Sequence, residues 1–440
     1  MCDDVRSADD IHFSSVQHYQ NVNKHLVLCH HCDLLVELPR LKFGQRAVCP
    51  RCETILSRRW RKPKAQPVGY AISALMMLFL AAVFPFINFR VSGNYHQIDL
   101  REIPMDLVTL DYPSLSLLFV FFVQLIPLIS MLAIILLCLD VPLPRSIRRT
   151  MAKVIFLFKP WCMVEIFLAG VLVSFVKLIS YGDIGVGLSF IAYCLFCLLQ
   201  IKAFNTIDKR WLWHHFSRAP NIEKDLIVGL TGASQGVRLC QCCHAILPKD
   251  REKCPRCHTH GQLRRKNSLS WTMSLLITSV ILYIPANIVP IMETVALGTP
   301  YSSTILEGVI TMWDDGSYPV ALVIFIASIL IPCLKIVAIG WLCYYASGKG
   351  MRESKRMHQM YEVVEFVGRW SMIDIFVIAV LSSLVQIGNL MGIFPDLGAI
   401  FFALVVILTM VSAAMFDPRL IWDRSPILIN KDTQRGEEEL

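Results

Sequence analysis

The sequence predicts an all-α polytopic membrane protein built as two parallel repeats, each with four transmembrane helices behind a small cytoplasmic zinc ribbon. Of its 440 residues, 55% are hydrophobic and only 17% are charged, and the mean hydropathy is +0.53. Soluble domains are about 45–50% apolar and about 25% charged. Long apolar runs recur along the chain, and the motifs of the first half return in the second.

The first element is a cysteine module at residues 25–60. Cys29, Cys32, Cys49 and Cys52 are spaced C-x2-C-x16-C-x2-C, which is typical of zinc sites. Four thiolates complete a tetrahedron and leave no position for a catalytic water, so we predict a structural zinc site. The spacing does not distinguish zinc from iron. Disulfides are the alternative, and a reducing cytosol disfavours them.

Eight apolar runs follow, most of them near the ~20 residues that cross a bilayer. They are 68–89, 114–139, 161–181, 186–204, 270–292, 319–345, 370–391 and 397–416. The first four form a predicted transmembrane module at 67–215 and the last four a second module at 268–424. The short connections 182–186 and 392–396 indicate tight hairpins.

Basic residues indicate the orientation. They gather before the first run, at Arg58, Arg59, Arg61, Lys62 and Lys64. More lie in the expected loops 140–160 and 346–369 and in the segment 205–268. By the positive-inside rule both termini are cytoplasmic, and residues 425–440 form a cytoplasmic tail. The net charge of +8 then reflects topology, and we expect no nucleic-acid binding.

An internal repeat relates the two halves. "CHHC…CPRC" at 29–52 returns as "CQCC…CPRC" at 240–257, and "DKRWLW" at 208–213 returns as "DPRLIW" at 417–422. The third spans match as "PWCMVEIF" and "RWSMIDIF". The second ribbon, at 236–264, would hold its metal through Cys240, Cys243, Cys254 and Cys257. Both halves run in the same orientation, as in a parallel repeat.

A carboxylate within a span needs an explanation, because a charge at the bilayer centre costs about 2.5–3.5 kcal/mol. Asp374 stands in the seventh run, and Lys335 in the sixth run falls in the same half of the bilayer, within pairing reach. Hydroxyl groups are spaced to join them, from Ser328, Ser371 and Thr409. This cluster predicts a proton relay or a headgroup-binding site. The alternative is a structural salt bridge.

The first half lacks the pair. Glu165 corresponds to Asp374, but Ser130 occupies the position of Lys335. Lys177 lies twelve residues beyond Glu165, about 18 Å along a helix and too far for direct contact. Glu165 and Lys177 are therefore secondary candidates.

Other readings stay open. Cys194 and Cys197 form C-x-x-C within a span, which would suit a membrane thiol or quinone oxidoreductase, although packing is the simpler role. A scaffold that only holds a partner is a third reading. The sequence has no P-loop, H-E-x-x-H or G-x-S-x-G motif, so we expect no enzyme activity.

Several motifs resemble the paraquat-inducible protein A (PqiA) family, which includes LetA. They are the two "CPRC" ribbons, "GSYPVA", "ILIP", "EFVGRWSMIDIFVIAVLS" and "FDPRLIWD". The similarity covers residues 25 to 424 and is closer to PqiA. It implies a bacterial inner-membrane protein with tetraspanin-like helical modules and zinc ribbons.

The resemblance also implies partners and a site. The protein would pass phospholipids to or from an MCE-domain tunnel protein of the PqiB or LetB type, and an outer-membrane lipoprotein of the same system is a further candidate partner. The polar cluster of the family matches Ser328, Lys335, Ser371, Asp374 and Thr409.

Overall fold

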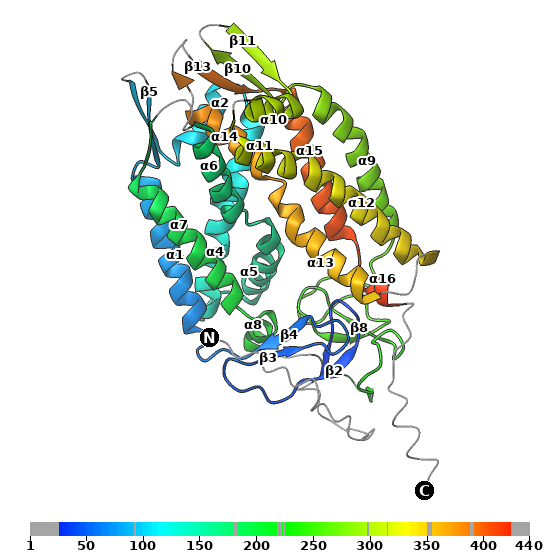
Figure 1. Ribbon diagram of the computed structural model, residues 1–440. Helices are drawn as coiled ribbons and strands as arrows, with labels where there is room; N and C mark the ends of the chain where they lie inside the picture. The colour runs from blue at the N-terminus through cyan, green and yellow to red at the C-terminus, as the bar shows by residue number, and fades with distance from the viewer. Residues whose placement is uncertain are drawn as a thin grey trace.

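A computed structural model describes residues 26–423, apart from 92–93, 179–182, 218–219, 221, 223–224, 297–298, 315, 350–353, 385 and 388–390. The predicted tail at 425–440 lies outside the described residues. The described chain is mostly helical, with small β-sheets at both ends of the long helices (Figure 1).

The two halves share the order of their main helices and strands, and they differ in the place of one short helical segment and in one additional strand of the second half. The first half comprises α1 Ala65–Val83, β5 Ile87–Val91, β6 Asn94–Ile98, α2 Glu102–Thr109, α3 Pro113–Phe119, η1 Val120–Leu125, α4 Ile126–Cys138, α5 Arg145–Phe158, η2 Lys159–Trp161, α6 Val164–Leu178, β7 Asp183–Val186, α7 Leu188–Thr206 and α8 Lys209–Phe216. The second comprises α9 Ser268–Ile288, β10 Met292–Ala296, β11 Thr299–Ser303, α10 Ile305–Asp314, α11 Tyr318–Ile324, η3 Phe325–Leu330, α12 Ile331–Tyr344, η4 Tyr345–Lys349, α13 Ser354–Trp370, α14 Ile373–Leu384, β12 Gln386–Ile387, β13 Met391–Pro395, α15 Leu397–Met415 and α16 Arg419–Trp422.

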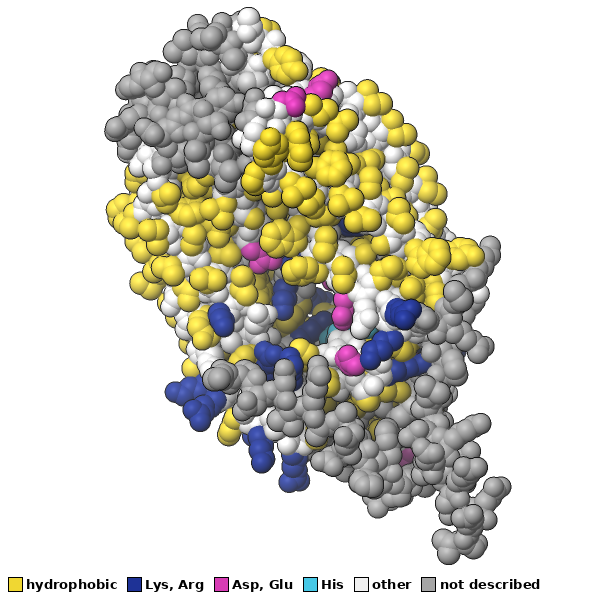
Figure 2. All heavy atoms as spheres, in the orientation of Figure 1, with side chains coloured by type: hydrophobic (Ala, Val, Ile, Leu, Met, Phe, Trp, Pro, Cys, Tyr) yellow, Lys and Arg dark blue, Asp and Glu magenta, His cyan; other side chains and the backbone are white. Residues whose placement is uncertain are grey.

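Seven helices within the described residues are long and apolar enough to cross a membrane. They are Ala65–Val83, Pro113–Cys138, Arg145–Phe175, Leu188–Thr206, Ser268–Ile288, Ala321–Gly348 and Leu397–Met415, the third of them counted across the break between α5 and α6. Hydrophobic side chains cover the middle of the visible face, and Lys and Arg gather toward the ribbon end (Figure 2). This distribution is that of a membrane protein.

The span predicted at 370–391 differs from the structure. Its helix, α14, has only 12 residues, and strand residues follow at 386–387 and 391–395. A turn at Ser371 and Met372 separates α14 from α13. The expected loops 140–160 and 346–369 contain the helices α5 and α13, which positive charge alone did not reveal.

The prediction of an all-α membrane part is wrong at the end opposite the ribbons. One antiparallel sheet has the order β11–β10–β13–β12, and another has the order β6–β5–β7. The predicted spans 68–89 and 270–292 therefore run too far, because β5 begins at Ile87 and β10 at Met292. Hydropathy does not distinguish a short apolar strand at the end of a span from a continuation of the helix.

The second span of each half contains a π-helical segment. The segments η1 and η3 each end one residue before a helix with proline at its second position, Pro127 in α4 and Pro332 in α12. Proline lacks the N–H donor and its ring crowds the carbonyl four residues earlier. A π-helical turn accommodates that clash, and such turns are frequent at functional sites.

The halves meet along equivalent helices. α6 of the first half packs on α14 of the second. A Cβ added at Gly170 would lie 3.2 Å from the Cβ of Phe376, so glycine permits this close approach. Glu165, at the start of α6, also accepts a 3.5 Å contact from Arg369 at the end of α13. The cluster residues of the second half thus border the first half.

Candidate metal centres and a buried polar cluster

Each predicted ribbon gathers its four cysteines. The Sγ–Sγ distances are 3.4 Å for Cys29–Cys52 and 3.5 Å for Cys32–Cys49. In the second ribbon they are 3.5 Å for Cys240–Cys257 and 3.6 Å for Cys243–Cys254. A tetrahedral zinc with Zn–S bonds of about 2.3 Å separates its sulfurs by about 3.8 Å. The two cysteine clusters therefore fit a four-coordinate metal ion.

All four C-x-x-C turns share one backbone geometry. The residue after the second cysteine has a left-handed backbone, with φ between 54° and 62° at Asp33, Glu53, His244 and His258. Its N–H donates to the carbonyl of the first cysteine in every turn, over 2.8 to 3.0 Å. This turn directs two thiols to the same side. Cys242 has no place in either set of four.

The ribbons dock in a crossed manner. The ribbons contain three antiparallel hairpins. The strands are β1 Leu26–Leu28, β2 Leu35–Glu37, β3 Arg46–Val48 and β4 Ile55–Arg58 in the first ribbon, and β8 Val237–Leu239 and β9 Ile246–Pro248 in the second. Arg51 of the first "CPRC" lies 4.8 Å from the ring centroid of Trp422, at the end of the second half. Arg256 of the second lies 6.0 Å from that of Trp213, at the end of the first half.

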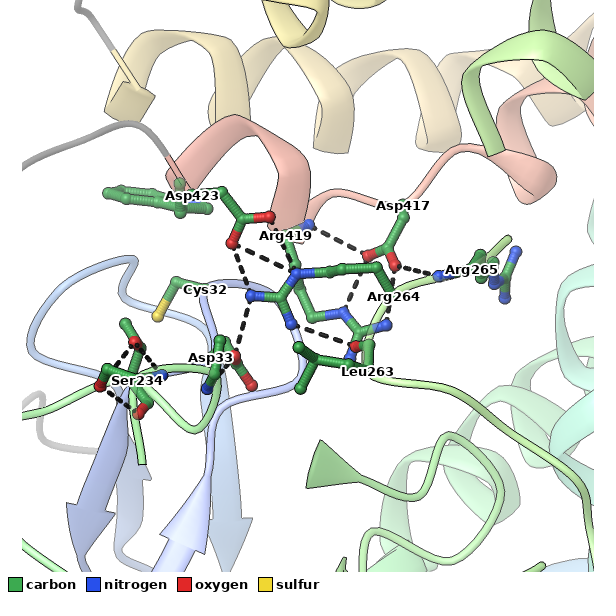
Figure 3. A network of polar contacts seen from close by, with 12 residues as sticks. Cys32, Asp33, Ser234, Leu263, Arg264, Arg265, Asp417, Arg419 and Asp423 are labelled. Carbon is green, nitrogen blue, oxygen red and sulfur yellow. Dashed lines mark hydrogen bonds and ion pairs between the residues drawn. The ribbon is translucent and has the colours of Figure 1, made fainter. Parts of the chain in front are cut away.

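A polar network fixes the first ribbon to the C-terminal end of the second half (Figure 3). Arg264 donates to Asp33 over 2.9 Å and binds both carboxylate oxygens of Asp423, over 2.5 to 3.2 Å. Beside it, Asp417 accepts from Arg419 over 2.7 and 2.8 Å and from the backbone N–H of Arg265 over 3.1 Å. Asp417 and Arg419 are both only 3% exposed.

Asp374 begins a helix rather than interrupting one. It lies in the first turn of α14, and Glu165 lies in the first turn of α6. The first N–H groups of a helix lack intrahelical partners, and the helix dipole favours negative charge there. The break before each helix thus reduces the free-energy cost of placing a carboxylate within the membrane. The sequence matched these two acids to each other but placed Asp374 within a continuous span.

Lys335 is buried beside a glycine. Its side chain is 4% exposed, and its Nζ donates to the carbonyl oxygen of Gly368 over 3.4 Å. A Cβ on Gly368 would lie 2.8 Å from Cε and 2.9 Å from Nζ of Lys335. Glycine therefore makes room for the ammonium group against α13. Sequence reasoning missed Gly368, although a glycine three residues before Ser371 was a visible signal.

The remaining cluster residues are buried on the surrounding elements. Ser328 on η3, Ser371 before α14 and Thr409 on α15 are each 1% exposed, and Asp374 is 8% exposed. Among the described residues, the hydroxyls of Ser328 and Ser371 have no hydrogen-bond partner, whereas Thr409 donates to the carbonyl of Val406 over 2.9 Å.

The elements that carry these residues pack on one another. α12 packs against α13 and α15, and η3 against α14. The structure brings Lys335 to Gly368, close in sequence to Ser371 and Asp374. Direct pairing of Lys335 with Asp374 stays a prediction. The secondary candidate Glu165 contacts Arg369, and the side chain of Lys177 lies outside the described part of α6.

Comparisons with known proteins identify relatives along nearly the whole chain. The pattern of the family described as Paraquat-inducible protein A matches residues 65–217 and 269–425. The chain is 56% identical over 408 residues to a protein of Escherichia coli K12 named Intermembrane transport protein PqiA, covering 93% of this chain and 98% of that protein.

More distant relatives match over similar lengths. Identity is 28% over 400 residues to Lipophilic envelope-spanning tunnel protein A of E. coli K12, covering 90% of both chains. It is 28% over 409 residues to a Haemophilus influenzae protein named Probable intermembrane transport protein, covering 90% of this chain and 95% of that one. No solved structure matches the chain significantly.

Proposed function

The chain belongs to the paraquat-inducible protein A family, and from this we propose that it is the inner-membrane component of an MCE-type lipid transport system. One relative is named for intermembrane transport and another for a lipophilic envelope-spanning tunnel. The seven apolar, membrane-length helices found in the described residues support the same role. In this proposal the protein loads phospholipid into, or receives it from, a periplasmic tunnel protein with MCE domains.

The proposed topology has two tetraspanin-like modules of four helices, 67–215 and 268–424, with both termini cytoplasmic. The repeated order of elements supports it, as do the basic residues beside the ribbons. In each half α6 or α14 supplies the third spanning segment, shortened and preceded by the cytoplasmic helix α5 or α13. The two β-sheets at the end opposite the ribbons then face the periplasm, where an MCE partner would dock.

We propose that the polar cluster of the second half handles the lipid headgroup. The observation that carries this is the burial of Lys335 against Gly368 within an apolar bundle. A buried ammonium group attracts the phosphate of a phospholipid, and the hydroxyls of Ser328 and Ser371, which have no hydrogen-bond partner in the described part of the chain, offer additional donors. Intramembrane ionisable residues usually mark substrate or proton pathways.

Proton coupling is a finer part of the proposal. In it, the cluster around Lys335 and Asp374 changes charge as the lipid moves, because the sequence offers no nucleotide site to drive transport. Coupling predicts that Asp374→Asn alters both lipid delivery and its dependence on pH. Unchanged delivery and pH dependence in that variant would rule coupling out.

Photocrosslinking at Leu334 tests the lipid site. Leu334 precedes Lys335, and its side chain is 57% exposed on α12. The matched control is Ile129 on α4, the equivalent position of the first half, 36% exposed and followed by Ser130 instead of lysine. A photoreactive residue replaces each in turn, and captured phospholipid is identified by mass spectrometry.

We expect capture at Leu334 to exceed capture at Ile129 and to fall when Lys335 is changed to Met. Equal capture at the two positions, unaffected by Lys335→Met in a folded protein, would reject the headgroup site. That result would favour the scaffold reading.

The ribbons are proposed to be structural zinc sites. When bound, zinc supplies folding energy by linking the four thiolates of each set. All four positions of each site are sulfur, so the ribbons offer no open coordination position for catalysis.

The oxidoreductase reading rests on Cys194 and Cys197 of α7, which are free thiols with Cys197 buried. Only that reading predicts loss of function when both are changed to serine, so lipid transport by the double variant separates it from our proposal.

A further inference from the structure

A group of metal-ligating side chains lies outside both cysteine sites, where the first ribbon touches α13. His31 comes from the first C-x-x-C turn, and His358 and Glu362 come from α13. One ligand atom from each lies within 4.8 Å of the other two. His358 and Glu362 are four residues apart and so share one face of the helix.

The polar atoms of this group are poorly satisfied. His358 is 1% exposed, and its Nε2 lies 3.4 Å from Glu362 Oε1 and 3.4 Å from Thr54 Oγ1. The Nδ1 atoms of His31 and His358 are buried and have no hydrogen-bond partner among the described residues. A buried polar atom without a partner costs about 1–3 kcal/mol, so a bound ion would relieve an existing cost.

We propose that His31, His358 and Glu362 form a third metal site, for a divalent transition metal such as zinc. Two imidazoles and one carboxylate favour such an ion over magnesium or calcium, which prefer oxygen ligands. Tetrahedral zinc with bonds of about 2.0–2.1 Å requires ligand atoms about 3.4 Å apart. Glu362, whose side chain is 51% exposed, has the freedom to rotate inward and close the site.

The site differs from the cysteine sites in what it would do. Three protein ligands leave a fourth position for water, so the ion would exchange more readily than one held by four thiolates. It would join the first ribbon to α13, the helix that also carries Gly368. The repeat does not provide a second copy of this site. Arg149 and Lys153 occupy the positions equivalent to His358 and Glu362, and Cys242 occupies the position equivalent to His31.

Cobalt titration of the full chain in detergent tests the proposal, with the cysteine sites left loaded with zinc. We expect visible d–d absorption that saturates at one added Co²⁺ per chain, with no thiolate charge-transfer band. Glu362→Gln should weaken binding at least roughly tenfold, since even outer-shell changes cost 10–100-fold. The control is Glu53→Gln, an exposed acid that pairs with Lys355 at the same contact.

Three results would overturn the third site: no saturable visible band, a band with thiolate charge-transfer character, or equal binding by wild type and Glu362→Gln. A charge-transfer band would place the cobalt in a cysteine site. Because Glu362 is half exposed, its variant is expected to fold, so equal binding could not be attributed to unfolding. His358→Ala provides a second variant with the same expected loss.

Discussion

At the scale of single residues, the fit between Lys335 and Gly368 is the most specific feature of the polar cluster. Gly368→Ala adds a Cβ 2.8 to 2.9 Å from Cε and Nζ of Lys335, which must displace the ammonium group. Alanine favours helix over glycine by about 1 kcal/mol. We therefore predict a folded protein with impaired lipid transport, checked by thermal unfolding beside a lipid-transfer assay.

The control is Gly69→Ala in α1, where an added Cβ meets nothing within 4 Å. It should leave transport unchanged. If Gly368→Ala also transports normally, the position of the Lys335 amine does not matter for function.

Also at the residue scale, the buried pair of Asp417 and Arg419 should make stability depend on pH. Burial alone would raise the pKa of the Asp417 carboxyl, but hydrogen bonds and the charge of Arg419 outweigh it, so that pKa lies below its ordinary value. The ionised carboxylate therefore stabilises the fold above the unfolded-state pKa of about 3.9. That contribution is lost as pH falls through the lower folded-state pKa.

We predict that Asp417→Asn lowers the free energy of unfolding at pH 7 by about 3–5 kcal/mol, because it leaves Arg419 buried without its carboxylate. The difference from wild type should narrow as pH falls below about 4. Thermal unfolding along a pH series measures it. Asp423→Asn changes a side chain that is 36% exposed, so it should lower the free energy of unfolding by less. An equal loss in the two variants would contradict the claim that burial makes Asp417 the more important carboxylate.

At the scale of elements, the ribbons should depend on their four thiolates. Structural zinc contributes about 10–16 kcal/mol of apparent binding free energy in small zinc fingers. Cys32→Ser should therefore remove one zinc per chain and unfold the first ribbon, as measured by metal content and limited proteolysis. Cys242→Ser removes a thiol outside both sets of four and should keep both ions. Equal metal loss in the two variants would show that the sets are misassigned.

Sequence patterns predicted some elements well and others poorly. Cysteine spacing identified both clusters of four, because the C-x-x-C turn is a local geometry. Hydropathy located seven of the expected spans but not their ends. It does not show where an apolar helix stops and an apolar strand such as β10 begins. The many charges of α5 and α13 predict loops at these positions, because they mask the amphipathic pattern of the two helices.

At the scale of the whole molecule, long-range contacts were beyond sequence reasoning. The repeat indicated equivalent halves, but nothing in it indicated that each "CPRC" arginine docks on the tryptophan that ends the other half, Arg51 on Trp422 and Arg256 on Trp213. Likewise, the repeat matched Glu165 to Asp374, but it did not indicate that Glu165 contacts Arg369 across the interface between the halves.

The central claim is that the second half handles the lipid through its buried polar cluster. The most direct measurement is transfer of labelled phospholipid between vesicles by the reconstituted full chain together with the MCE-domain protein proposed as its partner. Lys335→Met should reduce transfer about tenfold or more, since a hydrogen bond to a charged group contributes about 1.5–3 kcal/mol. Ser130→Ala, at the matching position of the first half, should transfer lipid normally. Wild-type transfer by a folded Lys335→Met protein would contradict the account.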